Sequence, residues 1–439
     1  MVFNIVLGRD EKDREKFGIK ASIFLGKHYV KMGQTTSLSQ PVYLDVNKAH
    51  VVFVCGKRGT GKSYSLGVIA EGIALLPEEY RKRLSVLIFD TMGVYWTMKY
   101  PNHADEELLK QWGLQGKGIN ININVPIGFF EKYKQDGVPV DHPFALNPSE
   151  LNPEDWNLTF DLHHNDIIAV LIERVILELK QKNKNFSIDD ILFEIKNSEF
   201  DRETKLSAEN RFIAVKSWGV FSEKASKIKD ILEAGNINVI DLSAYAMMPN
   251  GWRIKHLVTG LVSNSIFRQR MSFRKEEEFK AISQATHYIS EETESKMPLV
   301  WVLIDEAHEF LPLEGTTAST FALKTLLREG RQPGISLVLA TQQPGKIHTD
   351  AMTQSDVILA HRLTAKIDTD ALGALMQSYL RAGLDKELNN LPKLPGACIA
   401  VDDVNERLYP MRVRPRYTWH GGSAPKLLSE KEKKKEFEL

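Results

Sequence analysis

The sequence feature that most constrains the fold is the stretch VVFVCGKRGTGKS at residues 51–63. A run of apolar, mostly β-branched residues is followed at once by glycines, a lysine and a serine, in the G-x-x-x-x-G-K-S spacing of a phosphate-binding loop. The glycines let backbone N–H groups converge on a phosphate chain in a conformation that side chains would obstruct. We therefore expect a strand, a nucleotide-binding loop and a helix over Ser63–Leu76 whose N-terminus faces the phosphates.

Each position of this loop has an expected task. Lys62 is expected to reach the β- and γ-phosphates of ATP, and the Ser63 hydroxyl is expected to ligate Mg²⁺. The residues expected to contact the nucleotide are Gly56, Lys57, Arg58, Gly59, Thr60, Gly61, Lys62, Ser63 and Tyr64. An ordinary glycine-rich turn is the disfavoured alternative, because the motif lies between a predicted strand and a predicted helix.

Six apolar runs predict the core of the fold. They are nearly continuous rather than alternating in polarity, which is typical of parallel strands covered by helices on both faces. The runs are His50–Cys55, Ser85–Phe89, Asn238–Leu242, Leu299–Ile304, Ser336–Ala340 and Val357–Ala360. The pattern predicts an α/β fold with a mainly parallel sheet, whose functional groups gather at the carboxyl ends of the strands. Polar residues at those ends are Asp90, Asp241, Asp305 and Thr341.

The pattern of elements divides the chain into four parts. Residues 1–46 carry short strands at Phe3–Leu7, Ala21–Leu25 and Val42–Leu44, which predict a small, barrel-like β element. Residues 47–95 and 236–410 form the predicted core, and residues 96–235 form a mainly helical insertion. Residues 411–439 form a C-terminal segment whose charge-rich end, Ser429–Leu439, is expected to be disordered.

Helical periodicity predicts five helices after the second core strand. They are His163–Gln181, Ile188–Lys196, Leu206–Val220, Glu223–Ala234 and Ile254–Arg274, the last of which continues through Glu276–Ile289.

The amino-acid composition limits which binding partners and which cellular compartment we expect for this chain. Lysine plus arginine equals aspartate plus glutamate at 57 each, so any contact with DNA must come from a local basic surface. Cys55 and Cys398 lie far apart in apolar runs and are expected to be buried thiols. The chain has no run of 18 apolar residues and no secretory pattern, which predicts a soluble cytoplasmic protein without membrane contact.

The stretch WVLIDE at residues 301–306 predicts the hydrolytic half of the site. Asp305 at a strand end can hold Mg²⁺ through water, and Glu306 can orient and deprotonate the attacking water. The alternative is a structural pair of acids, which the upstream phosphate-binding loop makes less favoured. The string DEAH at Asp305–His308 also matches a motif of superfamily-2 helicases. The downstream strand ends in ATQQ and no second set of their motifs follows, so we reject that interpretation.

Three further features leave alternatives open. Gln342, just after a predicted strand, is either a sensor of the γ-phosphate or a generic polar cap. On a helix expected over Thr320–Gly330 and just beyond it, Lys324, Arg328 and Arg331 form a basic stripe that either is simply solvated or meets an anion, such as a neighbouring subunit's γ-phosphate or a DNA backbone. Asp90 either supports the site indirectly or merely ends its strand.

The order of several motifs is more distinctive than any one of them. They are GKRGTGKS at Gly56–Ser63, INVIDLS at Ile237–Ser243, VLIDEAHEFLP at Val302–Pro312, LLREGRQPGISLVLATQQP at Leu326–Pro344, HRL at His361–Leu363 and VRPRYTWHGG at Val413–Gly422. Together they cover most of residues 47–422, and in this order they resemble the HerA-like branch of the HerA/FtsK superfamily of P-loop ATPases, which act as hexameric DNA translocases.

This resemblance implies a RecA-like core, a closed homo-hexameric ring with nucleotide sites between subunits, and a C-terminal brace over the adjacent core. It assigns the roles above to Lys62, Asp305, Glu306 and Gln342, and implies that Arg331 or Arg328 enters the neighbour's site as a catalytic residue. The sequence departs from the family's pattern in two places. Val94 replaces an acid in the turn after the second strand, and the N-terminal barrel is abbreviated.

Two functions are therefore weighed. The first is an ATP-driven translocase or helicase that acts on double-stranded DNA as a hexameric ring, with a nuclease or other effector as partner. The second is an assembly ATPase that organises such an effector, for example in antiviral defence, without processive translocation. A P-loop kinase fits poorly, because Gln342 and the HRL segment would have no task. Residues near Lys346–Thr349 and Gly315–Ser319 are the candidate DNA-contacting loops.

Overall fold

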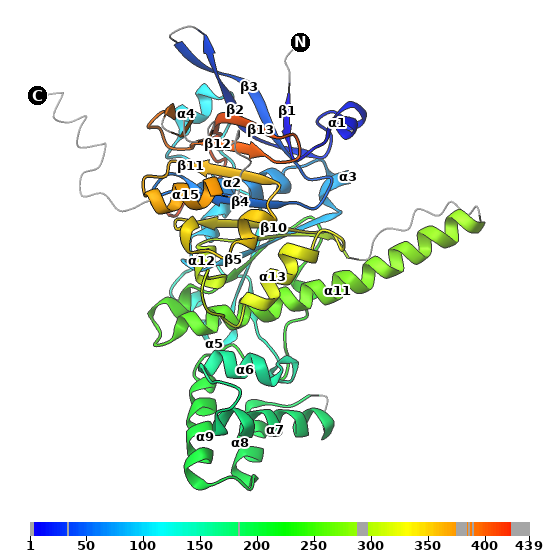
Figure 1. Cartoon of the computed structure of the whole chain (residues 1–439), viewed down its shortest axis with the longest axis vertical. Helices are drawn as coiled ribbons and strands as arrows, with labels where there is room; N and C mark the ends of the chain where they lie inside the picture. The colour runs from blue at the N-terminus through cyan, green and yellow to red at the C-terminus, as the bar shows by residue number, and fades with distance from the viewer. Residues whose placement is uncertain are drawn as a thin grey trace, which may run out of the picture.

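The computed structural model describes residues 4–32, 35–182, 185–287, 297–374, 384, 387–388 and 390–422. Its centre is one twisted sheet with helices on both faces (Figure 1). The parallel part of the sheet runs in the order β11 (Val357–His361), β4 (Val51–Cys55), β10 (Ile335–Thr341), β9 (Leu299–Ile304), β5 (Leu84–Asp90), β8 (Ile237–Asp241), β6 (Ile121–Pro126) and β7 (His142–Phe144). All six predicted core strands are present, so the expected mainly parallel α/β fold is confirmed.

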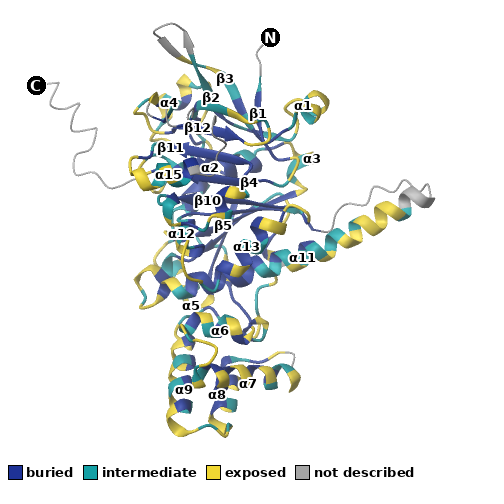
Figure 2. Cartoon of the chain, in the orientation of Figure 1, coloured by how far each residue is buried: buried dark blue, intermediate teal, exposed yellow. Residues whose placement is uncertain are grey.

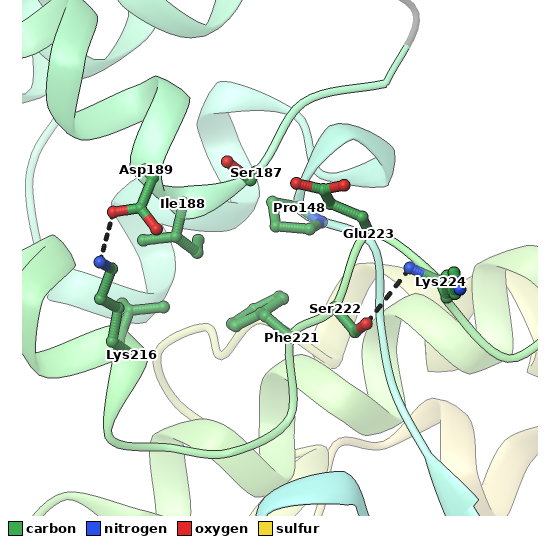
Figure 3. A pocket seen from close by; sticks show the side chains of 10 residues that line it. Pro148, Ser187, Ile188, Asp189, Lys216, Phe221, Ser222, Glu223 and Lys224 are labelled. Atoms are coloured by element: carbon green, nitrogen blue, oxygen red, sulfur yellow. Dashed lines mark hydrogen bonds and ion pairs between the residues drawn. The ribbon is translucent and has the colours of Figure 1, made fainter.

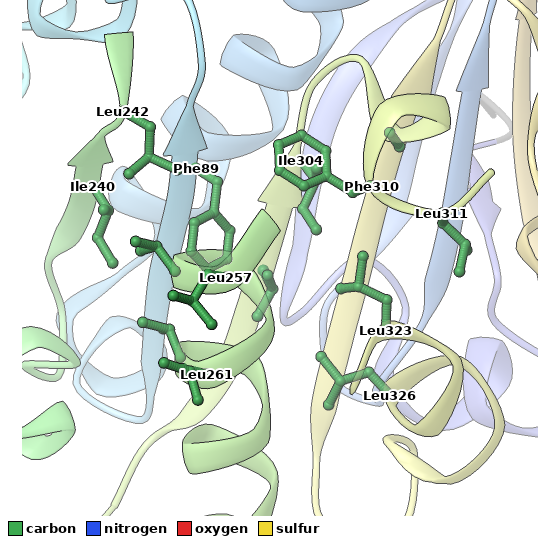
Figure 4. Packing of buried hydrophobic residues seen from close by; sticks show 14 of the residues in the cluster. Phe89, Ile240, Leu242, Leu257, Leu261, Ile304, Phe310, Leu311, Leu323 and Leu326 are labelled. Carbon is green, nitrogen blue, oxygen red and sulfur yellow. The ribbon is translucent and has the colours of Figure 1, made fainter. Parts of the chain in front are cut away.

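Two separate hydrophobic cores cover the two faces of this sheet. Helix α2 (Lys62–Ala74) packs on one face, within two residues of the helix expected after the loop. Helices α11 (Gly251–His287) and α13 (Thr320–Glu329) pack on the other face, where Leu323 and Leu326 point into the core (Figure 4). The central strands β4, β5, β8, β9, β10 and β11 are therefore buried almost throughout (Figure 2), which explains why they read as continuous apolar runs.

The insertion contains strands as well as helices. Its helices α6 (Pro153–Phe160), α7 (Ile167–Lys182), α8 (Ile188–Asn197) and α9 (Arg202–Lys216) lie together beyond one edge of the sheet (Figure 1). Before them, α5 (Ile127–Gln135) separates β6 from β7, and β6 pairs in parallel with β8, so the insertion extends the sheet before it turns helical. The Ile-Asn alternation at residues 121–124 is the signal for β6.

One expected helix is largely absent. The periodicity over Glu223–Ala234 predicted a full helix, but the structure forms only α10 (Ile228–Ile231) there. The preceding backbone is irregular and pairs with residues 145–146 instead: Ser222 N–H donates to the Leu146 carbonyl (3.0 Å) and Ser226 N–H donates to the Ala145 carbonyl (2.9 Å). This tertiary pairing overrides the local helical preference.

The N-terminal element joins the same sheet. It consists of β1 (Ile5–Leu7), α1 (Glu11–Phe17), β2 (Ser22–Met32) and β3 (Thr35–Asp45). Strands β2 and β3 are longer than the expected Ala21–Leu25 and Val42–Leu44, because two register shifts interrupt the alternation on which that expectation rested. β2 pairs with β13 (Arg407–Val413), and β13 pairs with β12 (Ala397–Asp402) beside β11, so the N-terminal and C-terminal strands together extend the core sheet.

The C-terminal segment is fastened to α2 of its own chain by one buried carboxylate. Glu71 is fully buried and accepts hydrogen bonds from Arg414 Nη1 (2.8 Å), Arg416 Nε (3.2 Å) and Thr418 Oγ1 (2.6 Å). Burial alone would raise the pKa of Glu71, but the two guanidinium charges and these hydrogen bonds outweigh it, and the pKa lies below its usual value. Within one chain, residues 414–418 therefore brace their own core; Ser429–Leu439 lies outside the described residues.

Candidate nucleotide site

The nucleotide loop joins β4 to α2 at the carboxyl edge of the sheet. Gly59 and Gly61 adopt φ values of +79° and +110°, which side chains rarely permit, so the glycines of the motif are required by the backbone itself. Lys62 begins α2 and is almost fully buried, with its Nζ 3.3 Å from the carbonyl oxygen of Lys57. The loop thus curls around its own lysine, and the N-terminus of α2 opens toward the space that it encloses.

The residues expected to hold Mg²⁺ lie next to each other. The Ser63 side chain hydrogen-bonds the carboxylate of Asp305, the first residue after β9. Burial raises the pKa of Asp305, and the Ser63 hydrogen bond and the Lys62 charge oppose that shift. A hydroxyl and a carboxylate fit Mg²⁺, which takes few protein oxygens and fills its shell with phosphate and water. Accordingly, the described part of the chain has no cluster of three or more histidine, cysteine or acidic residues able to hold a metal alone.

Glu306 follows Asp305 in a conformation that aims it away from the strand. Its φ is +50°, in the left-handed region, which is uncommon for a residue other than glycine. Burial, together with the neighbouring Asp305 charge, raises the pKa of Glu306 to about 7, and Lys62 and the backbone of Gln342 oppose that rise. Its Oε2 is buried and has no hydrogen-bond partner among the described residues. An oxygen in that state is suited to accept a proton from a bound water.

Gln342 lies beside Glu306. Strand β10 runs parallel to β9, so Gln342 leaves the sheet at the same edge as the two acids, and its backbone faces the Glu306 carboxylate. The structure therefore brings together Lys62, Ser63, Asp305, Glu306 and Gln342, which come from three different strands and loops of the sequence.

Arg328 and Arg331 lie near the amino ends of the parallel strands, opposite the carboxyl ends that carry the nucleotide loop. Arg331 precedes β10, whose seven residues span about 20 Å at ~3.3 Å per residue, and Gln342 follows that strand. In the same chain, Arg331 Nη2 donates to the Gln354 carbonyl (3.1 Å), and Arg328 Nε pairs with Asp350 (2.7 Å). The two arginine side chains keep about half their surface exposed, at 52% and 54% respectively. Neither arginine can reach the nucleotide loop of its own chain.

The Asp90 side chain stabilises the turn after β5. Its carboxylate accepts hydrogen bonds from the N–H groups of Met92 (3.1 Å), Gly93 (2.8 Å) and Tyr95 (2.8 Å). Burial, together with the adjacent Asp241 charge, raises the pKa of Asp90 to about 7. Of the two expectations for Asp90, these contacts fit a strand terminator that also fixes the neighbouring loop.

Tyr64 and two unexpected residues complete the surroundings of the loop. The Tyr64 hydroxyl donates a hydrogen bond to the Asp105 carboxylate (3.3 Å) and accepts one from the Arg416 N–H (2.6 Å). The C-terminal segment therefore helps to position the Tyr64 ring. Sequence reasoning gave no role to Glu71, which is buried within α2, or to His361, which is buried against that helix. A charged residue within the apolar helix segment VIAEGIA was the available signal for Glu71.

A cavity of about 440 Å³ lies elsewhere, in the helical insertion (Figure 3). Ile188, Val215 and Phe221 line it together with the Lys216–Asp189 ion pair. It shares no residue with the nucleotide loop.

Among the helices that the structure describes, none combines the length and the apolar character that a membrane span requires.

Comparisons with known proteins agree with this geometry. Residues 24–269 match the family described as helicase HerA, central domain. The chain is 24% identical over 355 residues to the probable DNA double-strand break repair helicase HerA of Methanocaldococcus jannaschii, covering 72% of this chain and 62% of that protein. It is 24% identical over 349 residues to the DNA double-strand break repair helicase HerA of Saccharolobus solfataricus, covering 76% of this chain and 58% of that protein. The chain thus spans about 60% of the length of these relatives.

A solved structure shares the fold. VirB4 of Thermoanaerobacter pseudethanolicus superposes with a TM-score of 0.54 at 13% identity, covering 96% of this chain and 99% of that one. The family match extends from β2 into α11 and includes the nucleotide loop, β5 and β8. With the P-loop and the acidic pair at one edge of a mainly parallel sheet, the chain belongs to the HerA helicase central-domain family.

Proposed function

We propose that this chain hydrolyses ATP at the site formed by the nucleotide loop and the Asp305–Glu306 pair. Lys62 and the N-terminus of α2 bind the phosphates, and Ser63 and Asp305 would hold Mg²⁺, which neutralises phosphate charge when bound. Glu306 accepts the proton of the attacking water, and Gln342 contacts the γ-phosphate. The observation that carries this proposal is the Oε2 of Glu306, which is buried near Lys62 and Asp305 and accepts no hydrogen bond from the described residues; His308 Nδ1 lies 3.6 Å from it.

We also propose that the site is completed by a second copy of the chain in a hexameric ring. Arg331 lies at the far edge of the sheet with half of its side chain exposed, so it can serve only a neighbour's nucleotide. Arg328 is the other candidate. An arginine supplied in this way stabilises the charge that develops on the transferred phosphoryl group.

A mixing experiment tests the shared site. Lys62→Ala and Arg331→Ala are each expected to lower ATP hydrolysis by at least about 10³-fold, in line with the effect of removing such an arginine. Mixed at equal amounts and allowed to exchange subunits, they should recover activity, because about one site in four then combines an intact loop with an intact arginine across a head-to-tail interface. Steady-state phosphate release measures this recovery; exchange without any recovery would argue against a shared site.

Double-stranded DNA is the proposed substrate of the ring. The two loops named as candidate contacts follow neighbouring strands at the carboxyl ends of the parallel sheet, and the segment just before Gly315–Ser319 pairs with Lys346–Thr349. Leu313 N–H donates to the Lys346 carbonyl (2.9 Å), and His348 N–H donates to the Leu311 carbonyl (2.9 Å). Lys346–Thr349 comes four residues after Gln342, and Gly315–Ser319 follows Glu306 after the short helix α12 (Ala307–Phe310), so a change at either residue would have a short path to a DNA contact.

The second candidate is an assembly ATPase that organises a nuclease or other effector without moving along DNA. The net charge of zero supports it, because the chain as a whole is not attracted to phosphates. Co-purification of a partner whose activity requires Lys62 would favour this candidate, whereas a ring that is fully active alone would count against it.

A further inference from the structure

His361 ends strand β11 directly behind the nucleotide loop. Its side chain is fully buried. Its Nε2 lies 3.0 Å from the hydroxyl of Ser65, in the first turn of α2, and its Nδ1 lies 3.2 Å from the carbonyl oxygen of Ala397, the first residue of β12. One ring therefore joins the nucleotide-binding helix to two strands.

The partners of the ring determine where its proton lies. A carbonyl oxygen only accepts hydrogen bonds, so Nδ1 must carry the proton that faces Ala397. Burial, assisted by the Lys62 charge, lowers the pKa of His361 to about 4, so the ring is neutral and Nε2 is a bare acceptor. The Ser65 hydroxyl lies 3.0 Å from both Nε2 and the Gly61 carbonyl oxygen, and its single proton can serve either acceptor. We assign that proton to Nε2, which carries none itself, because the Gly61 carbonyl also accepts the Ser65 N–H at 2.8 Å.

The same strand end also supports the loop through its backbone. Lys57 N–H donates to the Arg362 carbonyl (3.0 Å). A Cβ on Gly56 would lie 2.6 Å from the Cβ of His361, a contact too short to exist, so the loop lies directly against this residue. The back of the loop is thus fixed by residues that do not face the nucleotide.

We propose that His361 is a positioning residue for nucleotide binding. Through Ser65 it fixes the first turn of α2, and with it the N–H groups and the Lys62 side chain that receive the phosphates. This inference rests on the proposed binding of ATP to the loop. It predicts a defect in affinity, whereas a residue that only fills space would change the stability of the fold.

Four variants of the full chain, which are three single substitutions and one double, test the proposal by equilibrium binding of ATP and by thermal unfolding without nucleotide. Ser65→Ala removes only the hydroxyl, and His361→Asn keeps a donor for Ala397 but nothing at the Nε2 position. Each should raise the Kd for ATP about fivefold, the effect of one ordinary hydrogen bond. The double variant should bind no more than slightly worse than either single one, because both remove the same interaction. His361→Gln, whose amide extends toward Ser65, should regain most of the affinity.

The outcomes separate cleanly. If the parent chain does not bind ATP, the proposed function itself fails. If the parent binds ATP and Ser65→Ala binds it equally well, the positioning role is overturned, whether or not His361→Asn folds. Independent, multiplying effects of the two single variants would also contradict it, since the two residues would then act through different contacts.

Discussion

Replacing Glu306 with glutamine is expected to lower kcat for ATP hydrolysis by about 10²- to 10⁴-fold, the usual contribution of a general base, while ATP binding persists. Glutamine keeps the size of the side chain but cannot accept the proton of the attacking water. The raised pKa of Glu306, about 7, places this carboxyl where a base works best near neutral pH. Steady-state phosphate release and equilibrium binding of ATP measure the two effects separately.

Glu309→Gln is the matched control for this prediction. Glu309 lies three residues further on, in the short helix α12 (Ala307–Phe310), and its side chain is exposed. The Glu309 charge makes only a lesser contribution to the raised pKa of Glu306, after burial and the Asp305 charge, so the same chemical change there should leave kcat within about twofold. Equal losses in the two variants would mean that the Glu306 carboxylate is not the base.

The second large effect is expected on stability, from Glu71→Gln. The substitution neutralises a fully buried carboxylate and leaves the guanidinium groups of Arg414 and Arg416 buried without their counter-charge. Breaking a buried ion pair from one side typically costs about 3–5 kcal/mol. Urea unfolding should therefore show a markedly lower midpoint, with the C-terminal segment released from α2 before or with the core.

The pH dependence of this contact has a definite sign. Because the pKa of Glu71 is lower in the folded chain than in the unfolded one, the contact stabilises the fold above the unfolded pKa and is lost as the pH falls through the folded pKa.

Glu78→Gln, at an exposed ion pair with Lys82, is the control for Glu71→Gln and should leave the midpoint of urea unfolding unchanged. An unshifted midpoint for Glu71→Gln would show that the C-terminal segment does not depend on this carboxylate.

The convergence of the candidate site residues at the carboxyl ends of the strands could be predicted from the sequence because each motif is local. A glycine-rich loop, a lysine and an acid pair after an apolar run each carry their own signal, and parallel pairing then brings Lys62, Asp305 and Gln342 to one edge. The central strands were equally readable, because burial on both faces leaves them continuously apolar.

The features that sequence reasoning missed depend on distant contacts. Glu71 and Arg414 are 343 positions apart, and nothing local shows that they meet. The short α10 forms in place of a longer helix because the backbone before it pairs with residues 145–146. The strands β2 and β3 were predicted too short because register shifts between them interrupt the alternation of apolar and polar residues. The assignment of site residues to catalysis stays a prediction, as does the division of the chain into four parts.

The most direct test of the account is the rate of ATP hydrolysis with and without duplex DNA, measured across a range of salt concentrations. Duplex DNA should raise the rate, and added salt should weaken that stimulation because phosphate contacts release counterions. Lys346→Ala should reduce the stimulation, whereas Lys82→Ala, just before β5 at the opposite edge of the sheet, should keep it. An identical rate with and without duplex DNA at every salt concentration would contradict the proposal that this chain is a DNA-dependent ATPase.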